Sequence, residues 1–331
     1  MAVRLTLVMI LALGAAAPVC TAQVSHRFGD RQPQPRRPET IRIATYNVLN
    51  LFDHRDDPAL KGDQDDMPQA KPIPECRELA KAIRAVDADI IALQEVESLE
   101  ALQSFRDEFL ADMGYEYMAS IDVGYYRGVE NAVLSRFPIS GAKAPANARI
   151  DRVKRHGGGW ADPPKENVPR TFQRTPLRCD ITTPEGYELT LFNVHHKSGR
   201  SNRYHREGEA LALVDRINTV ARKDPGRNIV LLGDFNAAPW DRSMDVYRDA
   251  GFIDVMADPT RERHKTHESD RTLDFILLNS AAHRELVPGS AHVYGVKSPP
   301  KSFDWKNDKR PPEAPSDHYP VIIDLVPSDQ P

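Results

Sequence analysis

The stretch Val230-Leu231-Leu232-Gly233-Asp234-Phe235-Asn236 holds an apolar run that stops at a glycine and is followed by two polar side chains. The apolar residues are typical of the end of a buried strand, and Gly233 interrupts the run. Side chains two residues apart in an extended chain point to the same side, so Asp234 and Asn236 can project together. An ordinary turn has the same composition, so the pattern becomes informative only if other parts of the chain supply partners.

Five other places in the sequence combine a predicted strand with a polar residue that a core strand does not need. These residues are Asn47, Glu95, His195, Asp274 and the pair Asp317-His318. Burying such groups without partners is costly, so they either lie at a surface or satisfy one another. Each one alone has an ordinary explanation, such as a turn, a helix cap or a satisfied strand-end histidine. Together with Asp234 and Asn236 they predict one polar cluster at one edge of the sheets.

The remaining pattern predicts an α/β fold. Alternating or short apolar runs predict strands over 41–47, 89–95, 115–121, 131–135, 141–150, 174–181, 187–193, 228–232, 273–278 and 321–325. Apolar residues at helical spacing predict helices over 79–86, 99–113 and 203–222. Strands alternate with helices early and follow one another later, which favours mixed sheets over a doubly wound parallel sheet. No linker is visible inside 41–327, and we interpret this range as one domain.

The first 40 residues differ in composition from the rest. Arg4 precedes the apolar run Leu5–Ala17, which is shorter than the ~20 residues that span a bilayer. We interpret residues 1–22 as a signal peptide, which predicts a secreted or periplasmic protein, with lipid attachment at Cys20 as the less favoured alternative. Residues 23–40 hold three Pro and four Arg without an apolar period, which predicts a flexible lead-in.

Composition limits the remaining possibilities. Hydrophobic residues make up 40% of the chain, ample for a core, and the formal net charge is −4. Because there is no global basic surface, binding of a polyanion requires local basic patches or a metal ion. Removal of the leader leaves two cysteines, Cys76 and Cys179. In an exported protein such a pair predicts one disulfide, and two separate buried thiols are the alternative.

The polar strand ends belong to six motifs in a fixed order. The motifs are Ala44-Thr-Tyr-Asn47, Leu93-Gln-Glu95, Asn193-Val-His195, Gly233-Asp-Phe-Asn236, Leu273-Asp-Phe-Ile276 and Ser316-Asp-His-Tyr-Pro320. This ordered set resembles the endonuclease/exonuclease/phosphatase superfamily, which includes deoxyribonuclease I, exonuclease III, neutral sphingomyelinases and inositol polyphosphate 5-phosphatases. The resemblance implies a four-layer α/β sandwich with two facing mixed β-sheets and the site at one edge.

The resemblance also implies a metal site. Glu95 would bind the catalytic divalent cation, Mg²⁺ or Mn²⁺, with support from Asn47 and with Asp317 beside the metal. Oxygen ligands of this kind suit a hard cation. Whether one metal ion acts or two is left open.

Further roles follow from the same resemblance. Asp234 and Asn236 would orient the attacking water and contact the phosphate, and His195 would donate to a phosphate oxygen. Asp274 would orient His318. These residue types fit in-line attack of water on a phosphodiester, which needs charge stabilisation at the phosphoryl oxygens. Asp234 and His318 are both candidates for the group that takes the proton of the water.

Four more residues are weaker candidates for contact with substrate. Arg127 and Asn131 precede a segment that resembles the central strand of the family, and we expect one of them to touch phosphate. Lys197 and Arg200 follow His195 and can reach a phosphate, although solvated loop charges are the favoured explanation. Two histidines lack further ligands at a metal spacing and are predicted to be surface residues: His264 and His267.

The first functional hypothesis is an exported metal-dependent nuclease that cuts DNA, with RNA as a further candidate substrate. Two basic loops with interleaved aromatic residues, 151–174 and 297–310, favour nucleic acid, because such loops can grip a backbone and stack bases. Surface charge with incidental aromatic residues is the alternative explanation of these loops. The alternative is a sphingomyelinase-like or inositol-phosphatase-like phosphoesterase, and a non-catalytic binding domain comes third. We expect a monomer without stable membrane insertion.

Overall fold

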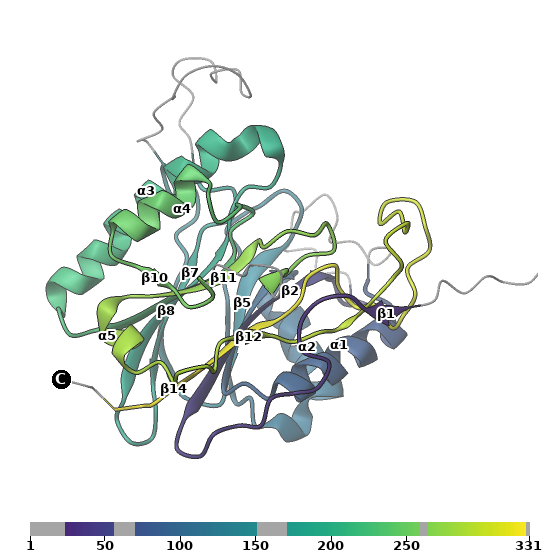
Figure 1. Cartoon of the computed structure of the whole chain (residues 1–331), viewed down its shortest axis with the longest axis horizontal. Coiled ribbons are helices and arrows are strands. Elements are labelled where there is room, and N and C mark those ends of the chain that lie inside the picture. Colours follow the sequence, from purple (N-terminus) through teal and green to yellow (C-terminus); the bar gives the residue numbers. More distant parts are fainter. Residues whose placement is uncertain (1–23, 56–69, 151–170, 258–263, 329–331) are drawn as a thin grey trace, which may run out of the picture.

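In the part of the chain that the structure describes, two mixed sheets of six strands each face one another (Figure 1). The structure is a computed structural model that describes residues 24–55, 70–150, 171–257 and 264–328. The first sheet has the order β12 (His292–Val293), β14 (Val321–Leu325), β2 (Ile41–Leu51), β3 (Ile90–Val96), β5 (Glu130–Ser135) and β4 (Tyr117–Ser120). The second has the order β10 (Ile253–Asp254), β11 (Asp274–Leu278), β9 (Asn228–Asp234), β8 (Glu188–His195), β7 (Leu177–Thr182) and β6 (Ile139–Lys143).

Helices cover the outer side of each sheet. The first sheet is covered by α1 (Ile73–Val86) and α2 (Leu99–Phe109), and the second by α3 (Arg203–Lys223) and α4 (Arg242–Asp249) (Figure 1). Among the described residues, three short helices lie outside these layers: η2 (Ala111–Met113), η3 (Arg200–Asn202) and α5 (Ser280–Arg284). Apolar residues at helical spacing form the buried stripe of each long helix. The predicted four-layer α/β sandwich with two facing mixed β-sheets is confirmed.

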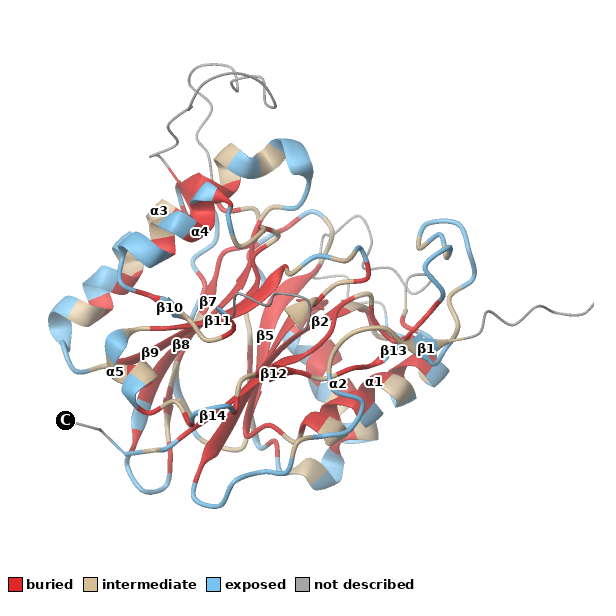
Figure 2. Cartoon of the chain, viewed as in Figure 1, coloured by how far each residue is buried: buried red, intermediate tan, exposed pale blue. Residues whose placement is uncertain are grey.

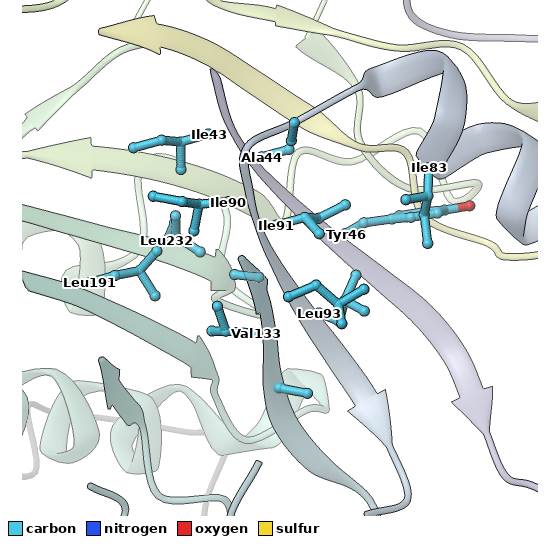
Figure 3. Close-up of a cluster of buried hydrophobic side chains, with 14 of the residues drawn as sticks. Ile43, Ala44, Tyr46, Ile83, Ile90, Ile91, Leu93, Val133, Leu191 and Leu232 are labelled. Atoms are coloured by element: carbon cyan, nitrogen blue, oxygen red, sulfur yellow. The ribbon is translucent and has the colours of Figure 1, made fainter. Parts of the chain in front are cut away.

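The period-two alternation of the strands separates two cores. On β9, Leu232 belongs to the core that fills the space between the sheets, whereas its neighbour Leu231 belongs to the core beneath α3 and α4. In Figure 3, Ile43 of β2 and Leu191 of β8 gather with Leu232 between the two sheets. Figure 2 shows the strands buried and the outward faces of the helices exposed. Both faces of β9 are therefore covered, which explains its continuous apolar run.

Gly233 ends that run with a backbone that other residues rarely adopt. Its φ is +136°, and a Cβ built there would lie 2.0 Å from the carbonyl oxygen of Val194 on the parallel neighbour β8. Both the conformation and the space therefore require glycine. We expect Gly233→Ala to lower the free energy of unfolding by more than about 3 kcal/mol, measured by urea denaturation.

Gly226→Ala is the matched control for this prediction. Its nearest heavy atom to a built Cβ is Asp224 Oδ1 at 3.8 Å, so the added methyl group meets only ordinary contact. We expect a change of less than about 1 kcal/mol there. Equal stability of the two variants would contradict the steric argument.

The described part of the N-terminal segment is attached to the domain, which corrects the expectation of a flexible lead-in over 23–40. Its strand β1 (Ser25–His26) pairs antiparallel with β13 (Lys297–Ser298). Arg27 forms an ion pair with Glu268 and donates to its backbone carbonyl oxygen at 3.0 Å. A two-residue strand has no period, so the sequence pattern could not reveal this attachment. The predicted signal peptide over 1–22 lies outside the described residues.

The predicted disulfide is wrong in this structure. Cys76 and Cys179 are both free and buried. Cys76 lies on α1, on the outer side of the first sheet, whereas Cys179 lies on β7 in the second sheet. The first sheet therefore separates the two thiols, and a disulfide needs Cα atoms roughly 4.4–6.8 Å apart. The alternative of two separate buried thiols is the one observed.

Other differences concern short elements and loops. The strand expected over 141–150 is β6, which ends at Lys143, and α4 was not predicted. Residues 151–170 of the first basic loop lie outside the described residues. In the second loop, 297–310, Phe303 and Trp305 pack edge to face with ring centroids 5.3 Å apart. None of the described helices is long and apolar enough to cross a membrane.

Candidate active site

Polar side chains from both sheets meet at one edge of the sandwich. Strands β2 and β3 pair in parallel, as do β8 and β9, so all four end at this edge. They contribute Asn47, Glu95, His195 and Asp234. The antiparallel strands β11 and β14 begin at the same edge, with Asp274 opposite Asp234 in the β11–β9 ladder and His318 shortly before β14. Strand direction therefore gathers residues that are far apart in the sequence.

His318 and Asp274 form a hydrogen-bonded pair. Nδ1 of His318 lies 2.8 Å from Oδ2 and 3.1 Å from Oδ1 of Asp274. A carboxylate accepts only, so Nδ1–H donates and the ring presents Nε2 to the centre of the site. That Nε2 lies 3.8 Å from Oδ2 of Asp234. Asp274 therefore fixes the orientation of the His318 ring.

Asp234 lies at the centre of the cluster. The side-chain Nδ2 of Asn47 donates to its Oδ2 at 3.2 Å, and the Nδ2 of Asn236 donates to the same atom at 3.1 Å. The backbone N–H of Asn236 donates to Oδ1 at 2.8 Å. His195 Nε2 lies 3.3 Å from Oδ2. These contacts hold one buried carboxylate between the two sheets.

Burial and mutual charge set the protonation of these groups. Burial raises the pKa of Asp234 to about 6, although the nearby His318 opposes the rise. Burial alone lowers the pKa of His318, but the carboxylates of Asp274 and Asp234 outweigh it and raise the pKa to about 10. Burial holds the pKa of His195 well below its usual value. At neutral pH the site therefore contains an ionised Asp234, a protonated His318 and a neutral His195.

Glu95 occupies a bulge that redirects its side chain. The register of β3 against β5 shifts between Gln94 and Val96, and Glu95 has a left-handed φ of 66°. Gln94 points between the sheets, where its Nε2 donates to Asn193 Oδ1 at 2.8 Å. In a regular strand the next side chain would point to the opposite face. The bulge instead brings Glu95 Oε1 to 3.8 Å from His195 Nε2.

The turn at the end of β2 contacts Glu95 and two basic side chains, those of Arg127 and Lys71. The backbone N–H of Asn50 donates to Glu95 Oε2 at 3.2 Å, and its Oδ1 accepts from Arg127 Nη2 at 2.7 Å. Arg127 Nη2 lies 3.8 Å from Glu95 Oε2. Buried Lys71 donates to the carbonyl oxygens of Val48 and Leu49 at 3.0 and 2.9 Å. Sequence reasoning missed Lys71, because no local pattern marks a lysine that folds back onto a turn.

Arg174 is a second residue that sequence reasoning missed. It is buried, and its Nε and Nη2 donate to the backbone carbonyls of His195 and His196 at 3.0 and 2.7 Å. Its guanidinium lies over the ring of Tyr125, 4.9 Å from the centroid. Arg174 thus holds the end of β8 in place. In the sequence it was only the first residue of a predicted strand, 174–181.

Of the four weaker candidates for substrate contact, Arg127 is the one that reaches the cluster in the described part of the chain. Asn131 is buried in β5 and donates to the carbonyl oxygen of Thr175 at 3.2 Å. Lys197 Nζ donates to Gln173 Oε1 at 3.0 Å. Arg200 is exposed in η3. The structure places these three beside the site rather than in it.

His267 lies against the site, which corrects its prediction as a surface residue. Its ring packs edge to face on His318, with centroids 4.6 Å apart, and its Nε2 lies 3.4 Å from Oδ2 of Asp317. Burial alone raises the pKa of Asp317, but His267 and His318 outweigh it and hold the pKa well below its usual value. No sequence spacing indicated this contact, because His267 precedes Asp317 by 50 residues.

The described residues offer several ligands for a divalent cation. Two groups have ligand atoms within 4.8 Å of one another, His267–Asp317–His318 and Asp234–Asp274–His318. Glu95 belongs to neither group, but its carboxylate and the neighbouring amide of Asn47 are oxygen donors of the kind that Mg²⁺ prefers. The donor chemistry thus fits a hard cation at Glu95. The ligand set Asn47, Glu95 and Asp317 stays a prediction.

A family model described as the endonuclease/exonuclease/phosphatase family matches residues 44–318. The chain belongs to this family, as its ordered motifs predicted. It is therefore a hydrolase of the phosphoester-cleaving kind, and members of this family generally depend on a divalent metal. No curated protein sequence matches the chain.

Solved structures support the fold. The catalytic domain of human nocturnin is 16% identical, with a TM-score of 0.57, and the match covers 92% of this chain and 96% of that chain. A truncated TDP2 from Caenorhabditis elegans is 15% identical, with a TM-score of 0.54 and coverage of 86% and 97%. A mannosyl-6-phosphatase from Bacteroides thetaiotaomicron is 20% identical, with a TM-score of 0.53 and coverage of 86% and 99%.

Proposed function

We propose that this protein is an exported nuclease that hydrolyses phosphodiester bonds of DNA, and also of RNA, with Mg²⁺ or Mn²⁺ as cofactor. Membership of a phosphoesterase family supports the reaction type. The arrangement of the strand-end cluster supports the use of water as nucleophile, because buried acid–base groups surround one point at the sheet edge. Secretion or periplasmic location is part of the proposal and rests on the leader-like residues 1–22.

The side chains of the cluster suggest a division of roles. A bound divalent cation at Glu95 would supply charge stabilisation to the phosphoryl oxygens. Asp234 is ionised above pH 6 and can accept the proton of an attacking water, while Asn236 and Asn47 hold its carboxylate. His318 is protonated and its Nε2 can donate to a phosphate oxygen. Of the two candidate bases that the sequence left open, Asp234 fits better, because His318 keeps its proton at neutral pH.

One observation carries the choice of nucleic acid over other phosphoesters. Among the described large hydrophobic residues, the two most exposed are aromatic: Trp240 is 64% and Tyr126 is 56% exposed. Each adjoins the site along the chain, since Tyr126 precedes Arg127 and Trp240 follows Asn236 by four residues. Exposed rings that are close in the sequence to residues of the cluster can stack on bases, with about 1–3 kcal/mol per base. This arrangement favours a polynucleotide over a small soluble phosphate ester.

The corresponding test compares two substrates in one double variant. We expect Tyr126→Ser with Trp240→Ser to lower kcat/KM for single-stranded DNA by about 10- to 100-fold relative to kcat/KM for bis-p-nitrophenyl phosphate. The small diester offers no base to stack. Val326→Ser is the matched control, because this side chain is 38% exposed but follows β14 at the end far from His318. An unchanged ratio in the double variant would count against the stacking role.

A substrate panel decides the proposal as a whole. Purified protein with Mg²⁺ is offered plasmid DNA, RNA, sphingomyelin and an inositol phosphate side by side. We expect cleavage of DNA and RNA to exceed the other reactions. Hydrolysis of sphingomyelin or the inositol phosphate without nuclease activity would replace the proposal with the phosphoesterase alternative.

A further inference from the structure

Three side chains at the rim of the catalytic cluster converge on a point that is separate from Glu95. His267 Nε2 lies 3.4 Å from Asp317 Oδ2, and His318 Nε2 lies 3.9 Å from Asp317 Oδ1. One ligand atom from each residue lies within 4.8 Å of the others. The set is two imidazole nitrogens and one carboxylate oxygen, whereas the predicted magnesium site is built from oxygen donors.

We propose that His267, Asp317 and His318 form a binding site for Zn²⁺, which shares Asp317 with the predicted magnesium site but does not include Glu95. Zinc bonds to histidine nitrogen and carboxylate oxygen are about 2.0–2.2 Å long, so neighbouring ligand atoms in a tetrahedron lie roughly 3.3 Å apart. His267 Nε2 lies 3.4 Å from Asp317 Oδ2, close to that value, whereas the 3.9 Å separation of His318 Nε2 is to the other carboxylate oxygen, Oδ1. Three protein ligands leave a fourth position for water.

The backbone fixes the two segments that carry these ligands. His267 and His318 form an antiparallel β-bridge. On either side of it, Glu268 N donates to the carbonyl oxygen of Asp317 at 2.9 Å, and Tyr319 N donates to that of Thr266 at 2.8 Å. Because paired backbone already holds these ligands in place, little conformational entropy is lost when a metal binds.

Hydrogen bonds behind the rings also orient the ligands. Nδ1 of His318 contacts Asp274 at 2.8 Å, and Nδ1 of His267 contacts the hydroxyl of Ser269 at 2.7 Å. His318 thus has a carboxylate acceptor for its Nδ1 proton, of the kind that metal-binding histidines commonly have. Nδ1 of His267 also accepts the backbone N–H of Ser269 at 2.9 Å. Each ring presents Nε2 towards Asp317, and zinc binding there displaces the proton that this nitrogen carries.

The carboxylate of Asp317 gives a separate observation that points to a bound cation. Its Oδ1 is buried and accepts no hydrogen bond from the described residues. The side chains of His267 and Asp317 are nevertheless 17% and 19% exposed, so a cation can reach them from solvent. A nitrogen-rich set also distinguishes zinc from magnesium, since Mg²⁺ prefers oxygen ligands and imidazole suits zinc.

Zinc at this site has a functional consequence that rests on the proposed function. His318 Nε2 is the atom that would donate to phosphate, and it lies 3.8 Å from Asp234 Oδ2. A metal bound to that nitrogen removes it from catalysis. The site therefore makes zinc an inhibitor of the magnesium-dependent reaction.

Calorimetry tests the site without use of activity. The full chain is stripped with a chelator, placed in excess Mg²⁺ and titrated with ZnCl₂. We expect wild type to bind one Zn²⁺ per chain and His267→Phe, which keeps the ring against His318, to bind it at least about tenfold more weakly. His267→Gln is measured in parallel as a second variant without the nitrogen ligand.

Two further variants serve as controls. His264→Phe removes a histidine three residues away on the same segment and should retain wild-type affinity. Glu95→Gln should also retain it, because the proposed site does not include Glu95. Equal zinc affinity in His267→Phe and wild type, loss of affinity in Glu95→Gln, or the absence of binding in excess Mg²⁺ would each overturn the proposal.

Inhibition gives a second readout. With Mg²⁺ held in excess, the zinc concentration that halves phosphodiesterase activity should rise at least about tenfold in His267→Phe, each variant being compared with its own uninhibited rate. If the protein proved not to be a phosphodiesterase, this inhibition assay could not be carried out, whereas the calorimetric test of zinc binding would still be valid. Zinc inhibition that is equal in the variant and wild type would overturn the inhibitory role.

Discussion

Removing either member of the His318–Asp274 pair is expected to lower kcat for phosphodiester hydrolysis by about 1,000-fold. The variants are His318→Gln, Asp274→Asn and the double variant. Because Asp274 acts through the ring that it holds at 2.8 Å, the double variant should lose little more than His318→Gln alone. Single-turnover kinetics on a fluorescent DNA oligonucleotide measure the three losses. Losses that multiply in the double variant would show that the two groups act independently.

The pH profile gives this prediction a second readout. In wild type, kcat should rise as the pH passes about 6, where Asp234 loses its proton, and fall towards pH 10, where His318 loses its own. Asp274→Asn removes a carboxylate that raises the pKa of His318, so the alkaline limb should move to lower pH. A structural role of Asp274 alone would lower the rate without moving that limb. Circular dichroism checks that each variant is folded.

Removal of the metal is expected to abolish the reaction. We expect EDTA to lower activity by more than about 1,000-fold and Mg²⁺ or Mn²⁺ to restore it, because a divalent cation at Glu95 would supply most of the positive charge that stabilises the phosphoryl oxygens. Glu95→Gln should show a similar loss at ordinary Mg²⁺ concentrations. Its side chain has the same shape but a far weaker affinity for a hard cation.

Glu100→Gln is the matched control for the metal prediction. Glu100 lies exposed in the first turn of α2, so the same chemical change there should leave kcat within about twofold of wild type. The Mg²⁺ concentration for half-maximal rate is measured in both variants. Full activity of wild type in EDTA, or of Glu95→Gln at ordinary Mg²⁺, would refute the assignment of the metal to Glu95.

Short-range patterns in the sequence were enough to predict most of the strands and the strand-end residues, whereas the two facing sheets were implied by the family resemblance. The apolar run before Gly233 became β9, and the alternation over residues 41–47 became the first part of β2. These predictions succeeded because period-two burial is a local property of a strand. The order of the six motifs indicated the family, since each motif places a polar group where a strand meets the sheet edge.

Only the tertiary structure decided which groups support the cluster. Lys71, Arg174 and His267 reach it through hydrogen bonds or ring contacts to segments far away in the sequence, and no periodic pattern indicated these contacts. The separation of Cys76 from Cys179 likewise depends on which side of a sheet each thiol occupies. The bulge that redirects Glu95 is a property of three neighbouring strands together. Such contacts depend on how layers stack, and the spacing of residues along one segment does not encode that stacking.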